Sequence, residues 1–467
     1  MKAFTAALME SKDFRRAAAL IDAGGCPLVF SGLESIHMAH FAAAVRAVCA
    51  RPVVVVCSDE LECERLRVNL SAFSGEDVRR LLAREFTFYN AESVSRQLEQ
   101  ERLSALGAMV SGTCSLFVAT PDALMQRTVP PKTFIGCSLT IAQGDTLSPE
   151  TLVASLLRCG YKHSGQVEGI GQFARRGGII DFFSPAYSLP VRCEFFGDEI
   201  DLMGFFDPAS QRRTENITEA AIFPAAETLP TLYEGAEEGF AEELQELLSK
   251  VRRRKGKHEK LADNIKSDLD RLSAGLPFSC ADRYFDILYP EFFCADSFFQ
   301  KDTVVLLCEP IKLEERAKNY IWRISEDTQA LLESGVIDGS QAKFIKTWEE
   351  CCERLSNFPV LMLDSFRGGK YPLSPRSLLS LSANQLPSYG GSLSTAAGDI
   401  IHYMKNGFRV IIACTDERRC AILGEYLENT GVIPGLDYSL EALPPAGNCV
   451  ICVGGVSSGI EYPTLSI

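Results

Sequence analysis

The sequence has few histidines and tryptophans, five and two among 467 residues, and no apolar run long enough to cross a bilayer. Its first residues do not place a charged region, an apolar core and a small-residue cleavage site in succession, which is the order of a secretory signal. These absences predict a protein without a membrane-spanning segment, and we expect it in the cytoplasm.

The sequence also lacks a paired-cysteine framework, although it has 17 cysteines. They are scattered mostly singly through stretches with strand and helix patterns, which is typical of reduced, buried thiols. The only Cys-x-x-Cys, at 449–452, lies in the apolar run CVICVGG without a second pair or a nearby histidine. This pattern favours a core strand, and we predict no metal site.

The sequence has fewer basic than acidic residues: 47 Lys and Arg and 61 Asp and Glu, which give a formal net charge of −14. This balance argues against a chain whose main surface is a nucleic-acid groove. The most basic run, 252–260, has no interleaved aromatic residues and is flanked by the acidic stretches 242–246 and 263–270. We interpret it as a solvated helical face, with DNA contact as the lesser alternative.

A complete phosphate loop is absent. Apolar strands alternate with amphipathic helices in the first segment, which predicts a parallel sheet. The loop after the strand at 27–31 is where a nucleotide-binding enzyme of this order would hold phosphates. That loop has one glycine, Gly32, and no lysine, and Glu34 would repel a nucleotide. The glycine-rich run 454–459 also lacks a Lys-Ser/Thr pair, so we predict no catalytic residue and no cofactor site.

The composition that is present, 46% hydrophobic and 23% charged residues, is ordinary for globular protein, and the length predicts three or four domains. Changes in pattern divide the chain into five parts: an α/β segment at 1–132, a strand-rich segment at 133–225, a mainly helical and charged segment at 226–345, a helical link and Pro/Ser-rich loop at 346–385, and a small α/β unit at 386–467.

The stretch 169–207 is the densest in strand and turn signals. Runs of β-branched and aromatic residues at 179–183, 191–196 and 200–206 are separated by turn sequences, which predicts an antiparallel meander. Alternation along the middle strand places Arg192, Glu194 and Phe196 on one face and the apolar side chains of Val191, Cys193 and Phe195 on the other. Alternation leaves open whether the first face is a protein interface or is covered by a helix.

Four motifs in this region carry a resemblance: FARRGGIIDFFSP, PVRCEFFGDEID, FDPASQR and IFPA occur in order. The series resembles the second domain of the bacterial transcription-repair coupling factors (Mfd), a domain shared with the excision-repair helicase subunit UvrB. The α/β segment before it and the helices after it resemble the same family across almost the whole chain. UvrB has an intact phosphate loop and a DNA-gripping hairpin in its first segment. This sequence has neither, and in this respect it resembles the coupling factors.

The resemblance implies a degenerate, P-loop NTPase-like α/β domain with an inserted α+β UvrA-binding domain, followed by a second small α/β domain. The segment 226–345 would complete the sheet of the first domain. The implied function is non-catalytic: an amino-terminal portion of a longer protein that recruits UvrA to stalled RNA polymerase. The polymerase-binding domain and the DNA translocase that uses ATP and Mg are not among these residues. The alternative is a diverged ATP-dependent DNA helicase or nuclease half with its own nucleotide site.

The family's contact residues carry over one by one. Arg176, beside Gly177, matches the arginine of an Arg-Gly step, Arg192 the arginine that opens the next strand, and Phe196 the second member of a Phe-Phe pair. Glu194 and Arg212 match an acidic residue and a Gln-Arg motif. Arg175 stands where relatives often have a small or β-branched residue, and we expect its charge to make the UvrA-binding patch more basic.

Overall fold

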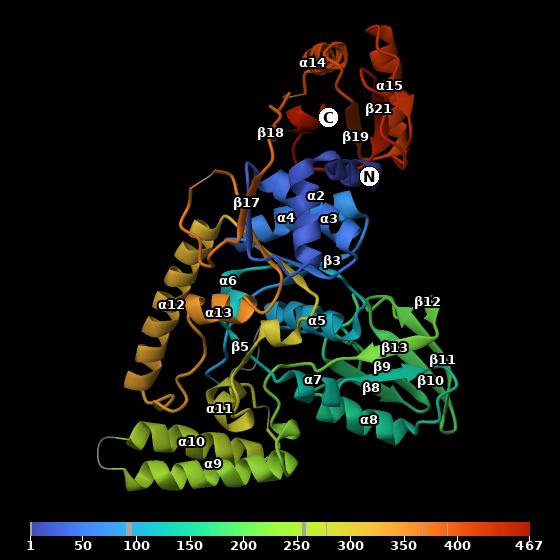
Figure 1. Ribbon diagram of the computed structural model, residues 1–467. Helices are drawn as coiled ribbons and strands as arrows, with labels where there is room; N and C mark the ends of the chain where they lie inside the picture. Colours follow the sequence, from blue (N-terminus) through green and yellow to red (C-terminus); the bar gives the residue numbers. More distant parts are fainter. Residues whose placement is uncertain (1, 90–95, 255–257, 277, 367, 390) are drawn as a thin grey trace.

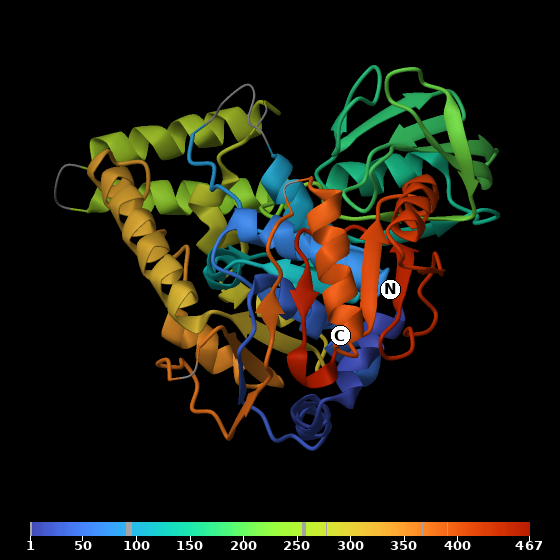
Figure 2. The same cartoon turned by 90° about the horizontal axis from the view of Figure 1, so that it is seen from above.

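The fold is that of a computed structural model, which describes residues 2–89, 96–254, 258–276, 278–366, 368–389 and 391–467. Figure 1 shows a central α/β layer with a strand-rich body beside it, a helical hairpin below and a small α/β unit above. In Figure 2, seen from above, this small unit lies in front of the central layer. The predicted mixed α/β, multidomain fold class is confirmed.

Seven parallel strands form the central sheet. Their inner members are short apolar runs such as VVVV, buried on both faces as parallel strands require. The spatial order is β17 (Ser377–Ser380), β1 (Leu28–Ser31), β16 (Val360–Asp364), β15 (Val304–Cys308), β2 (Val53–Val56), β4 (Leu116–Ala119) and β3 (Val78–Leu81).

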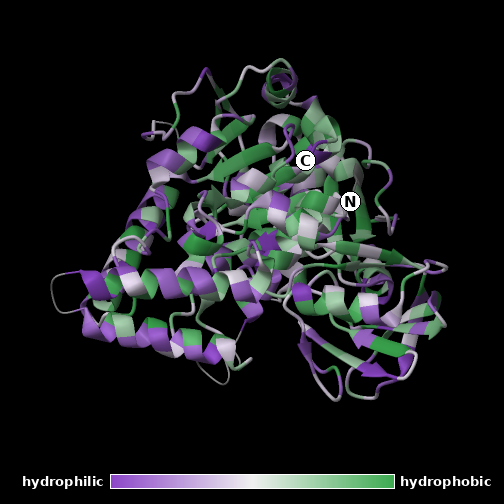
Figure 3. Ribbon diagram, turned by 90° about the horizontal axis from the view of Figure 1, so that it is seen from below, coloured by the Kyte–Doolittle hydropathy of each residue, from purple (hydrophilic) through white to green (hydrophobic). Residues whose placement is uncertain are grey.

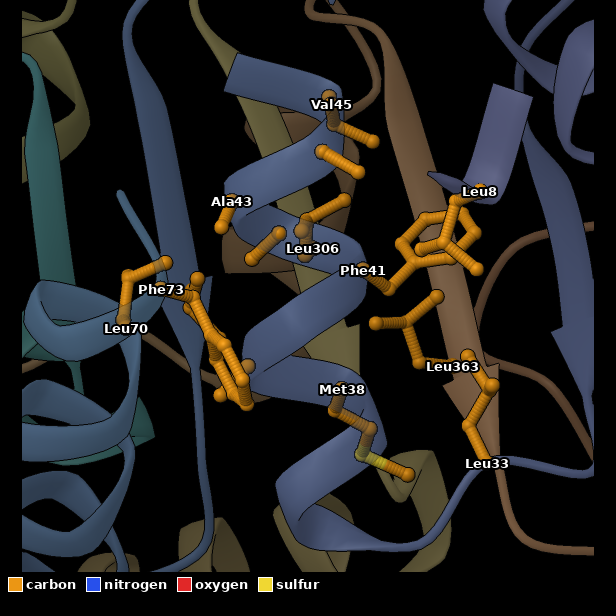
Figure 4. Packing of buried hydrophobic residues seen from close by; sticks show 14 of the residues in the cluster. Leu8, Leu33, Met38, Phe41, Ala43, Val45, Leu70, Phe73, Leu306 and Leu363 are labelled. Carbon is orange, nitrogen blue, oxygen red and sulfur yellow. The ribbon is translucent and has the colours of Figure 1, made fainter. Parts of the chain in front are cut away.

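Helices cover both faces of this sheet. Figure 4 shows Phe41 and Val45 of one helix packed between Phe73, Leu306 and Leu363 from a second helix and two strands. The helices on this first face are α2 (Lys12–Asp22), α3 (Ser35–Cys49) and α4 (Glu60–Ser74), and those on the second are α5 (Gln97–Ser111), α6 (Pro121–Met125), α12 (Pro310–Glu333) and α13 (Trp348–Leu355).

The edge strand β17 corrects one expectation. Its residues lie in the Pro/Ser-rich stretch that the sequence places in a loop, yet they pair with β1 in parallel register, Leu28 opposite Ser377. The main-chain groups of the apolar strand β1 need a partner on that edge, and a strand supplies hydrogen bonds whatever its side chains. Part of the stretch expected as a link therefore completes the central sheet.

The strand-rich body is a six-stranded sheet that contains the predicted antiparallel meander. Helix α8 (Pro149–Arg158) packs its buried residues Leu152 and Leu156 against one face. The order is β12 (Arg213–Ile217), β11 (Glu199–Phe206), β10 (Val191–Phe196), β9 (Ile179–Phe182), β8 (Gln172–Arg176) and β7 (Lys162–His163), and the pair β6 (Leu139–Ala142) and β13 (Glu219–Ile222) lies at its base.

The helical hairpin consists of α9 (Ala236–Arg253) and α10 (Glu259–Ser273), whose buried contacts include Leu248, Val251 and Ile265. Figure 3 shows mostly hydrophilic residues along its outer surface. Arg254, at the end of the first helix, pairs with Asp338 at 2.6 Å. The middle of the basic run, 255–257, lies outside the described residues.

The small unit has a parallel three-stranded sheet, and one face of it joins the core of the central layer through Val450 and Cys452. Its elements are α14 (Leu393–Lys405), α15 (Glu417–Asn429), β19 (Val410–Cys414), β21 (Cys449–Val453), β20 (Gly435–Leu436), and the pair β18 (Asn384–Gln385) and β22 (Ile460–Glu461). The remaining elements are α1 (Lys2–Ala7), α7 (Pro131–Cys137), α11 (Phe285–Leu288), and the pair β5 (Arg127–Thr128) and β14 (Phe293–Cys294).

Among the described residues, no helix is both long enough and apolar enough to span a bilayer.

A buried ion cluster fixes the strand-rich body to the central layer. We define the cluster by Arg84, Arg102, Glu227 and Asp282, all nearly inaccessible to water. The two guanidinium Nε atoms lie 3.3 and 2.8 Å from the Glu227 carboxylate, and Arg84 also makes two bonds of 2.7 and 2.8 Å to Asp282. Glu227 follows the last strand of the body, so the cluster holds the point where the chain returns to the central layer.

The cluster predicts an acid-sensitive contribution to stability. Burial alone would raise the pKa of Asp282, but the charge and hydrogen bonds of Arg84 outweigh it and lower that pKa. A lowered folded-state pKa stabilises the fold above the unfolded-state value of about 4, and the stabilisation is lost as the pH falls through the folded-state value. The Asp282→Asn variant should unfold more easily at pH 7, by about 3 kcal/mol, because it breaks a buried ion pair.

Urea unfolding of wild type and variant between pH 7 and pH 2 measures this. The difference between them should shrink as the pH falls below 4. Asp263→Asn, an exposed carboxylate on α10, serves as the matched control. Parallel stability curves for wild type and Asp282→Asn would contradict the assignment.

Candidate functional site

The two faces of the six-stranded sheet differ in what covers them. Ile180 of β9 and Val191 and Cys193 of β10 are fully buried under α8, and alternation along β10 predicts the burial of the last two. The opposite face, which we call the outer face, carries Arg176, Asp181, Arg192, Glu194 and Phe196 from β8, β9 and β10. Polar and aromatic side chains therefore share the face opposite to α8, the helix that Figure 1 shows beside this sheet.

Asp181 is the centre of the outer face. Its side chain is only 1% exposed, and it lies directly across the β9–β10 ladder from Arg192. Arg192 donates from Nε to Oδ1 at 2.7 Å and from Nη2 to Oδ2 at 2.9 Å, and Arg176 donates to Oδ2 at 2.6 Å. One buried carboxylate thus orients two arginines through charge-assisted hydrogen bonds.

Further contacts hold Arg192. Its guanidinium carbon lies 4.5 Å from the centre of the Phe206 ring, and Nη1 donates to the carbonyl of Gln211 at 3.3 Å. The hydrogen bonds to Asp181 raise the pKa of Arg192. Its side chain is 16% exposed, whereas that of Arg176 is 50% exposed. Arg192 therefore presents one fixed edge to solvent, and Arg176 presents a more open cation.

Phe196 is the most exposed large apolar side chain of the body, at 82%. It ends β10 and pairs with Glu199 across the turn at Gly197, whose φ of 64° suits a residue without a Cβ. A single exposed apolar residue is common on protein surfaces, but an aromatic ring beside ordered arginines has the composition of an interface hot spot.

Glu194 is held on the outer face by Arg213, a residue that the sequence alone does not single out. Its carboxylate pairs with Arg213 of β12. Gly204, on the intervening strand, lies beneath this pair, and a Cβ there would lie 2.6 Å from the carbonyl oxygen of Glu215 and 3.1 Å from Cδ of Arg213. The predicted residues Arg176, Arg192 and Glu194 are thus each anchored by an opposite charge.

The two remaining predicted residues, Arg175 and Arg212, take no part in the ion pairs of Asp181 and Glu194. Arg175 points to the opposite side of β8, where it pairs with Glu150 in the first turn of α8. The expectation that its charge makes the outer face more basic is therefore wrong, because strand alternation separates it from Arg176. Arg212 is exposed in the turn between β11 and β12, where its carbonyl accepts a hydrogen bond from the Asp207 N–H.

The loop that could have held a nucleotide is closed by the chain itself. The N–H groups of Gly32 and Leu33 donate to the carbonyl of Asp364, at 2.9 and 3.3 Å. A Cβ at residue 32, whose φ is 87°, would clash with the carbonyl of Leu381. Over the described ranges, no group of three or more His, Cys, Asp and Glu side chains is placed to hold a metal ion.

Comparison with known proteins places this face in a recognised domain. Residues 139–227 match the UvrB interaction domain, so the chain is a mixed α/β protein that carries such a domain. Over almost its whole length it is similar to the transcription-repair-coupling factor of Bacillus subtilis, with 25% identity over 465 residues, 98% of this chain and 39% of the relative. The chain thus carries a UvrB interaction domain and is similar, over nearly all of its length, to part of a transcription-repair coupling factor.

Other coupling factors show the same likeness. That of Myxococcus xanthus is 35% identical over 208 residues, 43% of this chain and 17% of the relative. That of Staphylococcus aureus (strain MRSA252) is 23% identical over 420 residues, 88% of this chain and 34% of the relative. The chain spans about two fifths or less of the length of these relatives.

The central position of Asp181 predicts a coupled loss of stability. Asp181→Ala would leave the cations of Arg176 and Arg192 without their shared carboxylate, and we expect it to cost about 1–3 kcal/mol of unfolding free energy. Asp201→Ala, an exposed carboxylate in the same sheet, should cost little. In urea unfolding, Asp181→Ala combined with Arg192→Ala should cost less than the sum of the single changes. Additive costs would show that the two side chains act independently.

Proposed function

We propose that this chain is a non-catalytic recruitment module that binds the excision-repair ATPase UvrA through the outer face of its UvrB interaction domain. The observation that carries the proposal is the Phe196 ring, exposed beside two arginines that one buried carboxylate holds in place. Aromatic and arginine side chains dominate the binding energy of protein interfaces. Because these arginines are already held in place before binding, association costs less conformational entropy.

The proposed coupling role rests on the relatives. The relatives are named for coupling transcription to repair, and the proposed part of this chain is to bring UvrA to RNA polymerase stalled at damaged DNA. We assign the contacts with polymerase and DNA, and the ATP and Mg of a translocase, to residues other than these. The N–H groups of Gly32 and Leu33 already donate to Asp364 and would not be free to bind a phosphate. They favour this assignment over a helicase or nuclease half with its own nucleotide site.

The first binding test removes the exposed ring. Phe196→Ala should weaken binding to purified UvrA by on the order of 1–4 kcal/mol, as truncation of a hot-spot residue does. The fold should stay intact, since the ring makes few contacts within the chain. Phe366→Ala, whose side chain is 78% exposed elsewhere on the molecule, is the matched control. Calorimetric titrations that give one affinity for wild type and both variants would reject the proposal.

The second test uses neighbouring arginines on opposite sides of β8. Arg176→Ala should weaken UvrA binding by about 1–3 kcal/mol, because it removes a cation from the outer face. Arg175→Ala should change the affinity little, since Arg175 lies on the α8 side and its exposed ion pair with Glu150 contributes little energy. Equal effects of both changes would mean that net charge, rather than this face, controls the affinity.

A further inference from the structure

The small α/β unit has a strand with a free edge. β19 pairs with β21 on one side, and over the described residues no named strand pairs with its other side. Val410 N donates to Asn448 O at 3.0 Å and Gly454 N donates to Cys414 O at 2.8 Å, so these alternate residues face β21. The main-chain groups of Arg409, Ile411 and Ala413 therefore point to the free edge.

One hydrogen bond already forms at this edge. Arg409 N donates to the carbonyl of Ser466 at 2.8 Å, which is the bond a neighbouring strand would make there. The segment of Ser466 then turns away, because the Ser466 φ is 52° and Ile467 N–H donates back to Tyr462. The groups of Ile411 and Ala413 lie further along the same edge.

A cavity of about 520 Å³ runs along the free edge. Phe4 and Phe73 line it on one side of the β19 sheet, and Leu393, Ala397 and Ile400 of α14 line it on the other. A polypeptide strand sends alternate side chains to opposite faces, so a strand in this cavity would place side chains against both walls. Residues of β18 and β19 both line this cavity, and Figure 1 shows the places of these two strands in the small unit.

The lining specifies the character of such a strand. Two charged residues line the cavity, and both have partners: Arg409 makes bonds of 2.8 and 2.7 Å to Glu10, and Glu461 accepts from Asn384 at 3.1 Å. An additional charge would lose its hydration without gaining a free partner. Apolar side chains would instead gain about 25 cal/mol for each Å² removed from water.

We propose that the free edge of β19 binds an extended, uncharged apolar strand of a partner polypeptide by strand addition. Main-chain hydrogen bonds to Ile411 and Ala413 would give the pairing, and the two apolar walls would select the side chains. Such an edge, apolar and without an inward charge or proline, is one that folded proteins otherwise protect. This site is separate from the outer face proposed to bind UvrA.

The test uses the full chain and three forms of one synthetic peptide, an acetylated and amidated Thr-Val-Ile-Val-Ile-Val-Thr carrying a fluorophore. The first form is unmodified, the second is N-methylated on the odd central residues, and the third is N-methylated on all central residues. One edge of a strand carries the N–H groups of alternate residues, so strand addition predicts that the second form, which keeps one free edge, binds like the unmodified peptide and that the third binds at least 10-fold more weakly. Fluorescence anisotropy measures the affinities.

The chain supplies its own controls. Leu393→Lys, in the α14 wall, should weaken peptide binding at least 10-fold, while Leu378→Lys, equally apolar and exposed on β17, should not. Hydrogen–deuterium exchange of the fragment 409–414 should slow when the unmodified peptide binds. Equal binding of both methylated forms would reduce the site to an apolar pocket and overturn strand addition. Absence of binding, or the same protection arising from dimerisation without peptide, would overturn the partner strand.

Discussion

The carboxylate of Glu227, held between Arg84 and Arg102, is the constraint on which the arrangement of the parts depends. The central sheet takes its strands from residues as distant as 28–31 and 377–380, so the strand-rich body is an excursion that must leave and return at one place. Buried charges are costly unless they are paired, and an ion cluster therefore tolerates little displacement. The return point is fixed in position more sharply than apolar packing alone would fix it.

Asp181 is a second buried carboxylate that pairs with two arginines, but its partners differ from those of Glu227 in their exposure. Its carboxylate is as buried as that of Glu227, but the guanidinium groups bound to it reach the surface. The free energy of desolvating the acid is offset inside the chain, and the arginine donors acquire fixed directions at the outer face. Arg192 is accordingly both the partner of Asp181 and a residue of the proposed interface. Its truncation would change both, whereas truncation of Phe196 would change only the surface.

Strand alternation explains what the sequence could predict of this site and what it could not. The faces of β10 follow from one strand read alone, and Val191 and Cys193 are buried as expected. Asp181 was missed because its place beside Arg192 depends on the register of β9 against β10, which the eight residues between the strands do not specify. The resemblance puts the charge of Arg175 in the UvrA-binding patch without specifying its face, because the QFARR sequence has no strong strand signal; its pairing with β9 makes it a strand, with Arg175 on the α8 side. The same holds for β17, whose partner rather than its composition determines its structure.

The β1–α3 loop and the β19 edge differ in whether their outward main-chain groups have partners within the chain. At the β1–α3 loop, the amides that a phosphate would need donate to Asp364, and the backbone of Leu381 fills the adjacent space. At β19, by contrast, Ser466 uses the first outward N–H and the apolar space beyond it is left open. An unfilled main-chain edge between two apolar walls costs stability unless something pairs with it. The closed β1–α3 loop and the open β19 edge therefore support the two interactions proposed above, both of which are with other polypeptides.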